Sequence, residues 1–366
     1  MPNRKFTLPE YPVESDLWDE LARLNKPIVV YGMGNGADKL LSRFEKYGIC
    51  ASDIFASDGF VRGHNFHGMR VKSFSEIKAE YSNFVVVLSF ASNREEVLEM
   101  LTDIDRNYDL YIPDMPVAGE EYFDKDFYND NYHLIKEAYA SLCDDASRDV
   151  FCSLIRYKLS GRMSDLMAAV ATRDELYSLI RCRECYVDVG AYNGDTVREV
   201  LSYCPDVRKI IAIEPDLKNY KRLLKLLERD KLMDLVTPIN AAASDKNSTR
   251  EMISSGNRNS SLASTSSYES HMQTVEEITL DSLKLDACDY IKYDVEGEEL
   301  SALVGARETI ERNHPTLLVS AYHRSCDIFS LILYLRKAHP EYRLYLRRLR
   351  CVPAWEIDIV ARYRET

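Results

Sequence analysis

The sequence has no uninterrupted apolar run long enough to span a bilayer, and its first residues, MPNRKF, lack the apolar core of a secretory signal peptide. Positive charge is also scarce, because 47 Lys and Arg stand against 59 Asp and Glu, a formal net charge of −12. This balance argues against nucleic acid as a partner, since phosphate contacts need clustered cations. We expect a cytoplasmic protein with no transmembrane segment.

A cysteine pattern typical of disulfides or zinc is missing as well. The nine cysteines are an odd number and are widely scattered, which predicts reduced thiols. Cys182 and Cys185 have the spacing of a metal or redox pair, but no second such pair or nearby pair of histidines completes a zinc site. The sequence therefore predicts no metal centre.

What is present is a globular composition, with 366 residues of which 46% are hydrophobic and 29% charged. This length allows two domains. Short apolar runs alternate with helical patterns in the first third of the chain, where residues 27–31, 54–58 and 84–88 are expected to be strands. We predict a Rossmann-like α/β domain over residues 1–118.

The next stretch, residues 119–180, holds no convincing strand. Apolar residues recur at helical intervals over 132–142 and 147–159, which predicts a helical connector packed on the following domain. Exposed apolar surface on this connector could pair two chains into a homo-oligomer.

A second α/β domain is expected over residues 181–366. Its seven predicted strands cover residues 185–189, 210–214, 235–240, 289–294, 316–321, 342–348 and 356–363. The last two are so close in sequence that they must be antiparallel, whereas the helix-linked strands before them should be parallel. The predicted fold is thus two Rossmann-like domains joined by helices.

The clearest motif lies where the first of these strands ends. Residues 186–197 read YVDVGAYNGDTV, a buried strand that stops at glycines and continues into a helix. Such a turn lets a ligand approach the backbone near the positive end of the helix. Glu214 follows the next strand, 20 residues after Gly194, where nucleoside-binding folds hold the ribose hydroxyls. The sequence therefore predicts a nucleoside cofactor.

Four separated motifs in this half of the chain resemble the FkbM-like family of S-adenosylmethionine-dependent methyltransferases. They are residues 188–195, the pair Glu214-Pro215, residues 291–297 and the pair Tyr322-His323. The resemblance covers about 185–366. It implies a seven-stranded class I methyltransferase sheet with an antiparallel last strand, and S-adenosylmethionine as the cofactor.

The resemblance also implies which residues hold that cofactor. Asp188 and the glycine turn would hold its methionine part, Glu214 and Pro215 its ribose, and the segment up to Ala242 its adenine. The turn residues concerned are Gly190, Ala191, Asn193, Gly194 and Asp195.

Three residues are candidates for catalysis. Asp294 ends the fourth predicted strand, where an acceptor should meet the methyl group, and it could also bind the cofactor's amino group. Glu296 is a second carboxylate, unless it caps the helix that follows. His323 is the candidate general base, because imidazole titrates near neutrality; a structural role is the alternative. Asp294 and His323 alone are too few ligands for a metal.

The expected acceptor is a sugar, a glycan or another small hydroxylated molecule, with O-methylation as the reaction. The polar segment 254–262 is a candidate acceptor loop or a solvated loop. N-methylation of an amino group is one alternative, and a non-catalytic nucleotide-binding protein is another.

A glycine turn also follows the first strand of the N-terminal domain. Residues 32–37 read GMGNGA, and Gly32, Gly34 and Ala37 fit the dinucleotide pattern G-x-G-x-x-G/A. Asp58 ends the next predicted strand, 21 residues after Ala37. This domain is therefore a candidate for a nucleotide-type ligand, with a structural or docking role, or an NAD-linked activity, as alternatives.

Overall fold

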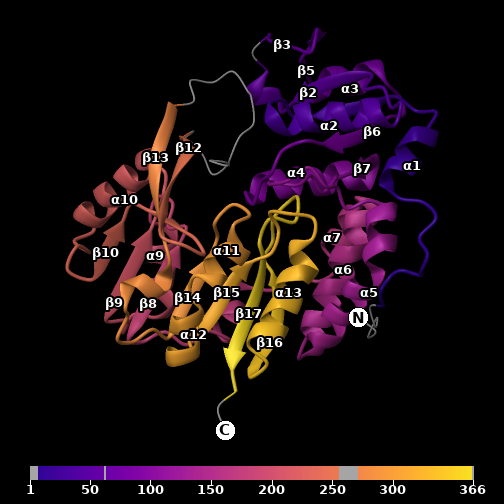
Figure 1. The fold of residues 1–366 in the computed structure, drawn as a ribbon. Helices are drawn as coiled ribbons and strands as arrows, with labels where there is room; N and C mark the ends of the chain where they lie inside the picture. Colours follow the sequence, from indigo (N-terminus) through magenta and orange to yellow (C-terminus); the bar gives the residue numbers. More distant parts are fainter. Residues whose placement is uncertain (1–6, 62, 255–270, 365–366) are drawn as a thin grey trace.

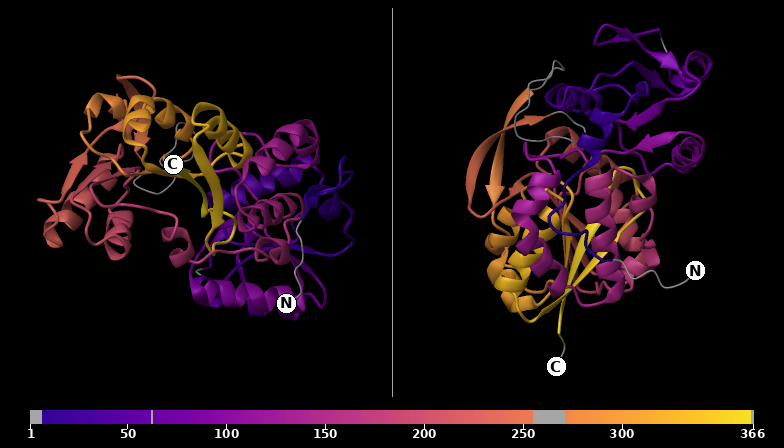
Figure 2. Two further views of the ribbon diagram at one scale, coloured as in Figure 1. Left: turned by 90° about the horizontal axis from the view of Figure 1, so that it is seen from below. Right: turned by 90° about the vertical axis from the view of Figure 1, so that its right-hand side faces the viewer.

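The computed structural model describes residues 7–61, 63–254 and 271–364. Two helix-covered sheets dominate this part of the chain, and a group of helices from the middle of the sequence lies beside the second sheet (Figure 1; Figure 2). The two sheets correspond to the two α/β regions that the sequence predicts.

The first sheet has five parallel strands in the order β5-β2-β1-β6-β7. These strands are β1 (Ile28–Tyr31), β2 (Asp53–Ala56), β5 (Lys72–Ser73), β6 (Val85–Leu88) and β7 (Asp109–Tyr111). One face is covered by α1 (Leu17–Arg23) and α2 (Asn35–Lys46), and the other by α3 (Phe74–Glu80) and α4 (Glu95–Asn107). A 3-10 turn and a hairpin add η1 (Asp58–Phe60), β3 (Asn65–Phe66) and β4 (Met69–Arg70).

The helices expected between the sheets are present. They are α5 (Lys125–Ser141), α6 (Asp145–Ser160), α7 (Met163–Leu166) and α8 (Arg173–Tyr177). Asp124 and Asp144 cap α5 and α6 by accepting backbone amides, and Gly161 ends α6 in the left-handed conformation. Buried apolar residues place α5 and α6 in the same core as the second sheet, so this segment is packed structure rather than a loose linker.

The second sheet has seven strands in the order β10-β9-β8-β14-β15-β17-β16. They are β8 (Cys185–Val189), β9 (Lys209–Ile213), β10 (Val236–Ile239), β14 (Tyr290–Tyr293), β15 (Thr316–Ser320), β16 (Tyr342–Arg348) and β17 (Ile357–Tyr363). The pairs from β10 to β15 are parallel, and β17 is antiparallel to both β15 and β16. The predicted strands and the antiparallel last pair are confirmed.

Helices cover both faces of this sheet. One face packs against α8, α9 (Asp195–Tyr203) and α10 (Leu217–Arg229). The other packs against α11 (Glu299–Val304), α12 (Arg307–Asn313) and α13 (Asp327–Ala338). A 3-10 turn, η2 (Leu280–Leu283), precedes β14.

A small third sheet is not expected from the sequence. It joins β11 (Ala242–Ala243), β12 (Ser248–Ser254) and β13 (His271–Ile278) in the order β11-β13-β12. The polar, charged composition of residues 248–254 and 271–278 hides these strands, because they are not apolar runs. The candidate acceptor loop at 254–262 lies outside the described residues, apart from the backbone of residue 254.

The two large sheets are connected by direct backbone contacts. The amide and carbonyl of Ser92, after β6, pair with the carbonyl and amide of Val352, between β16 and β17 (2.7 and 3.0 Å). Ala118 donates its amide to the carbonyl of His323 at 2.8 Å. The segments that follow β6 and β7 are therefore fixed to the carboxyl end of the second sheet.

Close packing accounts for two of the three glycines of the N-terminal turn. A Cβ added to Gly36 would lie 2.0 Å from the carbonyl oxygen of Ser89, and one added to Gly32 would lie 2.6 Å from the ring of Phe90. Gly34, with φ of 105°, precedes α2 as its N-cap. The turn is thus filled by the segment after β6, which gives it a structural reason for glycine.

Asp58 also has structural partners. Its carboxylate accepts hydrogen bonds from the amide of Phe74 (2.9 Å) and the hydroxyl of Ser75 (2.8 Å), at the start of α3. These contacts hold η1 against α3. The carboxylate that the sequence assigns to a nucleotide thus serves as a cap in this structure.

We predict that Gly36→Ala destabilises the fold by about 2 kcal/mol, because its methyl group has no space beside the Ser89 carbonyl. Urea unfolding measures the effect. Gly59→Ala is the matched control, since nothing lies within 4 Å of its added Cβ. Equal stability of the two variants would contradict the packing role of the turn.

Candidate active site

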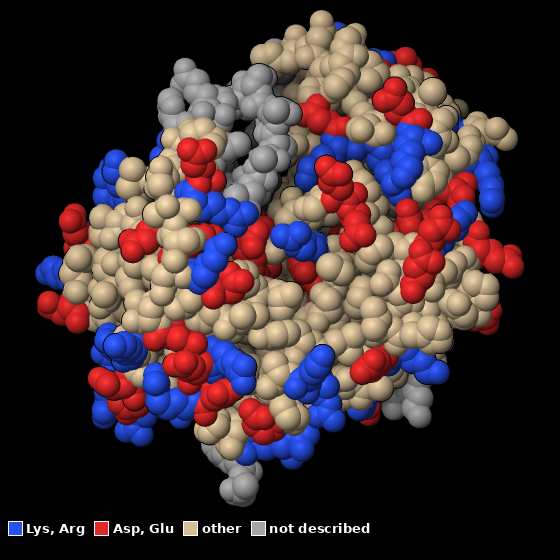
Figure 3. All heavy atoms as spheres, viewed as in Figure 1, with Lys and Arg blue, Asp and Glu red and all other residues tan. Residues whose placement is uncertain are grey.

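A cavity of about 420 Å³ opens at the carboxyl ends of β8, β9, β14 and β15. This is the edge at which open α/β sheets bind ligands. The space-filling view shows a hollow in the middle of the molecule with Asp and Glu side chains at its rim (Figure 3). Its wall includes residues from all three parts of the chain, among them Ser92, Val117, Tyr177, Gly190, Glu214, Ala242, Asp294 and Asp358.

The turn after β8 is pressed against the end of β14. Gly190 has φ of 93°, and a Cβ there would lie 1.9 Å from the carbonyl oxygen of Asp294. Another residue type cannot occupy this position without moving one of the two strands. Gly194, with φ of 88°, then begins α9 as its N-cap. The turn is therefore held close against the end of β14, at the edge of the cavity.

Asp188 lies behind that turn and is fully buried. One carboxylate oxygen accepts the hydroxyl of Thr196, and the other, Oδ1, has no hydrogen-bond partner among the described residues. Burial raises the pKa of Asp188, although the Lys292 ammonium opposes this effect. Asp188 therefore supports the start of α9 from beneath and does not itself line the cavity.

Glu214 follows β9 and faces the cavity, with 6% of its surface exposed. Its two oxygens accept the amides of Tyr192 (2.8 Å) and Asp216 (2.9 Å). Burial raises the pKa of Glu214 to about 8 despite these donors. The carboxylate is thus fixed in orientation, and each oxygen retains capacity to accept a further hydrogen bond.

The wall beyond Glu214 is built from small residues. Ala241, Ala242, Ala243 and Ser244 line the cavity after β10. The side chain of Asn240 donates to the carbonyl of Glu214 at 2.8 Å and so ties this segment to the end of β9. A flat apolar strip therefore lies beside a fixed carboxylate.

The end of β14 carries an ion pair between a buried lysine and a partly exposed aspartate. The Nζ of Lys292 lies 3.0 Å from an oxygen of Asp294, and Tyr322 donates its hydroxyl to the other oxygen at 3.1 Å. Burial favours the neutral acid, but the nearby Lys292 and His323 lower the pKa of Asp294 to about 2. Asp294 is therefore ionised at the cavity wall at neutral pH.

The turn after Asp294 is held by Glu299 rather than by Glu296. Glu299, the first residue of α11, accepts the amides of Val295 (2.9 Å) and Gly297 (3.4 Å). Glu296 lines the cavity and adopts φ of 56°. The N-cap residue of α11 is Glu298, which makes no side-chain capping hydrogen bond, and Glu299 holds the turn before the helix rather than capping it.

His323 is completely buried and does not line the cavity. Its Nδ1 lies 2.9 Å from Glu299, and its Nε2 lies 3.5 Å from Asp294 and 3.7 Å from Glu296. Burial disfavours the imidazolium, but Glu299 and the other two carboxylates raise the pKa of His323 to about 9. His323 already carries a proton at neutral pH, which conflicts with the general-base role expected from the sequence.

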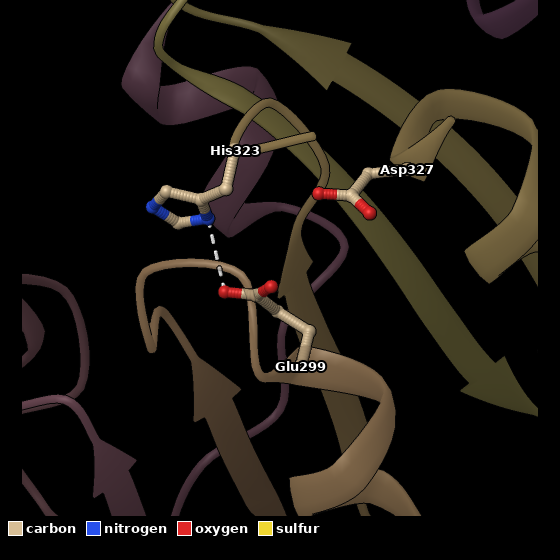
Figure 4. Close-up of side chains that lie close together, drawn as sticks. All are labelled: Glu299, His323 and Asp327. Atoms are coloured by element: carbon tan, nitrogen blue, oxygen red, sulfur yellow. Dashed lines mark ion pairs between the residues drawn. The ribbon is translucent and has the colours of Figure 1, made fainter. Parts of the chain in front are cut away.

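Asp327 completes a buried group with Glu299 and His323, whose ligand-type atoms lie within 4.8 Å of one another. Figure 4 shows the ion pair between Glu299 and His323, with Asp327 to one side. The Asp327 carboxylate accepts the amide of Arg324 at 2.7 Å. Because His323 and Glu299 are in direct contact, we interpret the group as an ion-pair cluster rather than a metal centre.

A family model described as the methyltransferase FkbM domain matches residues 188–351.

Residues 188–351 thus match the FkbM methyltransferase domain.

Among solved structures, methyltransferase FkbM from Methylobacillus flagellatus is similar over 98% of this chain and 95% of its own, with 19% identity and a TM-score of 0.68. The two-sheet fold with its intervening helices is therefore shared with that protein. TrmK from M. capricolum, solved with S-adenosyl-homocysteine, is similar over 54% of this chain and 70% of its own, with 12% identity and a TM-score of 0.34. A search of curated proteins found no significant match. Within the described residues, no helix is both long and apolar enough to cross a membrane.

The structure brings most of the sequence-predicted residues of the FkbM domain to one cavity. Those that line it are Gly190, Asp195, Glu214, Pro215, Ala242, Asp294 and Glu296. Asp188, Ala191, Asn193, Gly194 and His323 are outside the lining. The N-terminal candidates Gly32, Gly34, Ala37 and Asp58 are also outside it, so the structure does not join the two predicted sites.

Sequence reasoning missed several residues of the wall. Lys292 and Asp358 are charged residues inside apolar strands, and that interruption is a signal that could have found them. Ser92 and Trp355 reach the cavity through the contact between the two sheets, which no sequence pattern reveals.

We predict that His323 makes the stability of the FkbM domain depend on pH between 6.5 and 9. Over this range the folded protein keeps a proton that an unfolded histidine has released, so stability is greatest at low pH and falls as the pH rises to about 9. The effect is on the order of 3 kcal/mol.

Denaturant unfolding at several pH values tests this, with His323→Gln expected to lose that part of the pH dependence. His64→Gln, at an exposed histidine, is the control. If wild type and His323→Gln show parallel pH profiles, the imidazolium assignment is wrong.

Proposed function

We propose that this protein is an S-adenosylmethionine-dependent methyltransferase, and that it transfers the methyl group to a hydroxyl of a small acceptor such as a sugar or glycan. The observation that carries the proposal is Glu214, a buried and oriented carboxylate at the cavity edge of β9. The FkbM family assignment of residues 188–351 supports the reaction class.

The cavity fits such a cofactor in three places. Glu214 would accept the ribose hydroxyls, since both of its oxygens are fixed by amides and can accept again. Ala241 to Ala243 would contact the adenine. The bare backbone at Gly190 and the start of α9 at Asp195 would hold the methionine part. When bound, the cofactor supplies an electrophilic methyl group on a sulfonium.

The protein's contribution to transfer is to position the acceptor and exclude water. Asp294, kept ionised by Lys292, would accept a hydrogen bond from the acceptor hydroxyl and orient its lone pair. Glu296 is the second carboxylate on the wall and our candidate for receiving the proton. His323 acts as a fixed cation that holds Asp294 and Glu296, in place of the base role expected from the sequence.

N-methylation is the second candidate reaction. Among the described lining residues, nine are Asp or Glu and three are Lys or Arg. Such a wall favours a basic acceptor. A non-catalytic nucleotide-binding protein would share the cofactor contacts but release no S-adenosylhomocysteine.

We predict that Glu214→Gln weakens S-adenosylhomocysteine binding by about tenfold or more, because an amide nitrogen that cannot accept a hydrogen bond would replace one of the two oxygens offered to the ribose. Isothermal titration calorimetry measures the affinity. Glu214→Ala should weaken it further and lower the melting temperature, since two amides lose their partner.

Glu228→Ala is the matched control, because Glu228 is exposed on α10 and is not among the residues that line the cavity. Unchanged affinity in Glu214→Gln would refute the ribose contact. Absence of binding to well-folded wild type would refute the cofactor assignment as a whole.

A further inference from the structure

The cavity extends past the proposed cofactor wall to β17. The second sheet runs β8-β14-β15-β17, so β17 stands three strand spacings from β8, or about 14 Å. Asp358 on β17 pairs with Ser320 on β15, and both line the cavity. A group bound at Asp358 is therefore separate from the cofactor groups held by the turn after β8.

This end of the cavity has an apolar and aromatic surround. Leu176 and Tyr177 of α8 contribute, as do Leu349 and Trp355 from the connection between β16 and β17. Ser92 closes it from the N-terminal part of the chain, through its backbone pairing with Val352. The surround excludes water from a small polar group.

Asp358 is the unusual group at this end. It is 93% buried, because 7% of its surface is exposed, and its strand is otherwise apolar over 357–361. No side-chain hydrogen bond to its carboxylate occurs among the described residues. Burial, reinforced by Glu356, raises the pKa of Asp358 to about 8. Because Asp358 lines the cavity, a ligand that supplies a hydrogen-bond donor would stabilise its ionised form.

The nearby cations do not donate a hydrogen bond to the Asp358 carboxylate. Lys292 is paired with Asp294 at 3.0 Å, and Arg173 is paired with Glu199. Counted over the described lining, acidic residues exceed basic ones by nine to three. The cavity wall as a whole thus disfavours phosphate or carboxylate groups and favours a cation.

We propose that Asp358 is an acceptor-recognition residue that binds the protonated amino group of a small amine-bearing acceptor, such as an amino sugar or a polyamine. This inference rests on the proposed methyltransferase function, which makes this end the acceptor site. It holds for methyl transfer to an oxygen or a nitrogen of that acceptor.

Calorimetry with two matched pairs of probes tests the proposal: glucosamine against glucose, and 1,4-diaminobutane against 1,4-butanediol. Titrations are made with and without saturating S-adenosylhomocysteine. We expect the amine of at least one pair to bind about tenfold tighter than its hydroxyl counterpart, as a charge-assisted contact provides. The pair that shows the preference distinguishes an amino sugar from a polyamine.

In Asp358→Asn, the amine should bind no more than about twofold tighter than its hydroxyl counterpart. The affinity for S-adenosylhomocysteine should be unchanged. Asp286→Asn, at an exposed position, is the control and should keep the amine preference. Asp358→Ala repeats the test if the amide variant does not fold.

Lack of an amine preference in wild type, or a preference that survives Asp358→Asn, would overturn the proposal. Failure of S-adenosylhomocysteine to bind would instead reject the proposed function, so the two failures are distinguishable.

Discussion

The buried ammonium of Lys292 is the interaction on which the architecture of the site depends. A cation in the middle of an apolar strand is strongly destabilising unless carboxylates neutralise it. Asp294, two residues further along the chain, provides the direct partner at 3.0 Å, and the carboxyl groups of Asp188 on β8 and Asp358 on β17 interact with the same ammonium. This arrangement keeps Asp294 ionised at the cavity wall. It also brings charged groups of three strands together at one point on the sheet.

Steric contacts set the shape around that point. The turn at Gly190 approaches the Asp294 carbonyl so closely that no side chain fits between them. On the far side, the pairing of Ser92 with Val352 brings the segment after β6 over the cavity. The N-terminal sheet therefore acts as part of the enclosure of the FkbM domain. Because residues from both halves of the chain form the wall, the edge of the sheet becomes part of a cavity.

The sequence predicts the second sheet well because its strands are apolar runs bounded by turn residues, as at 185–189 and 316–320. It predicts the edge at which the cavity opens because glycine spacing and the placement of Glu214 reflect local backbone needs. It fails where the reason is long-range. From the sequence alone, His323 is a candidate base. In the structure, Glu299 at the start of α11 lies beside it and stabilises its protonated form. The turn at 32–37 fits a dinucleotide pattern, yet its glycines accommodate Ser89 and Phe90.

The most direct test of the central claim is a crystal structure of the protein with S-adenosylhomocysteine. We expect the ribose hydroxyls within hydrogen-bond distance of Glu214, the adenine beside Ala242, and the amino acid part at the turn after β8. The acceptor end near Asp358 should stay open to a second molecule. A nucleoside bound instead at the N-terminal turn around Gly34, or one that fills the space at Asp358, would contradict the account.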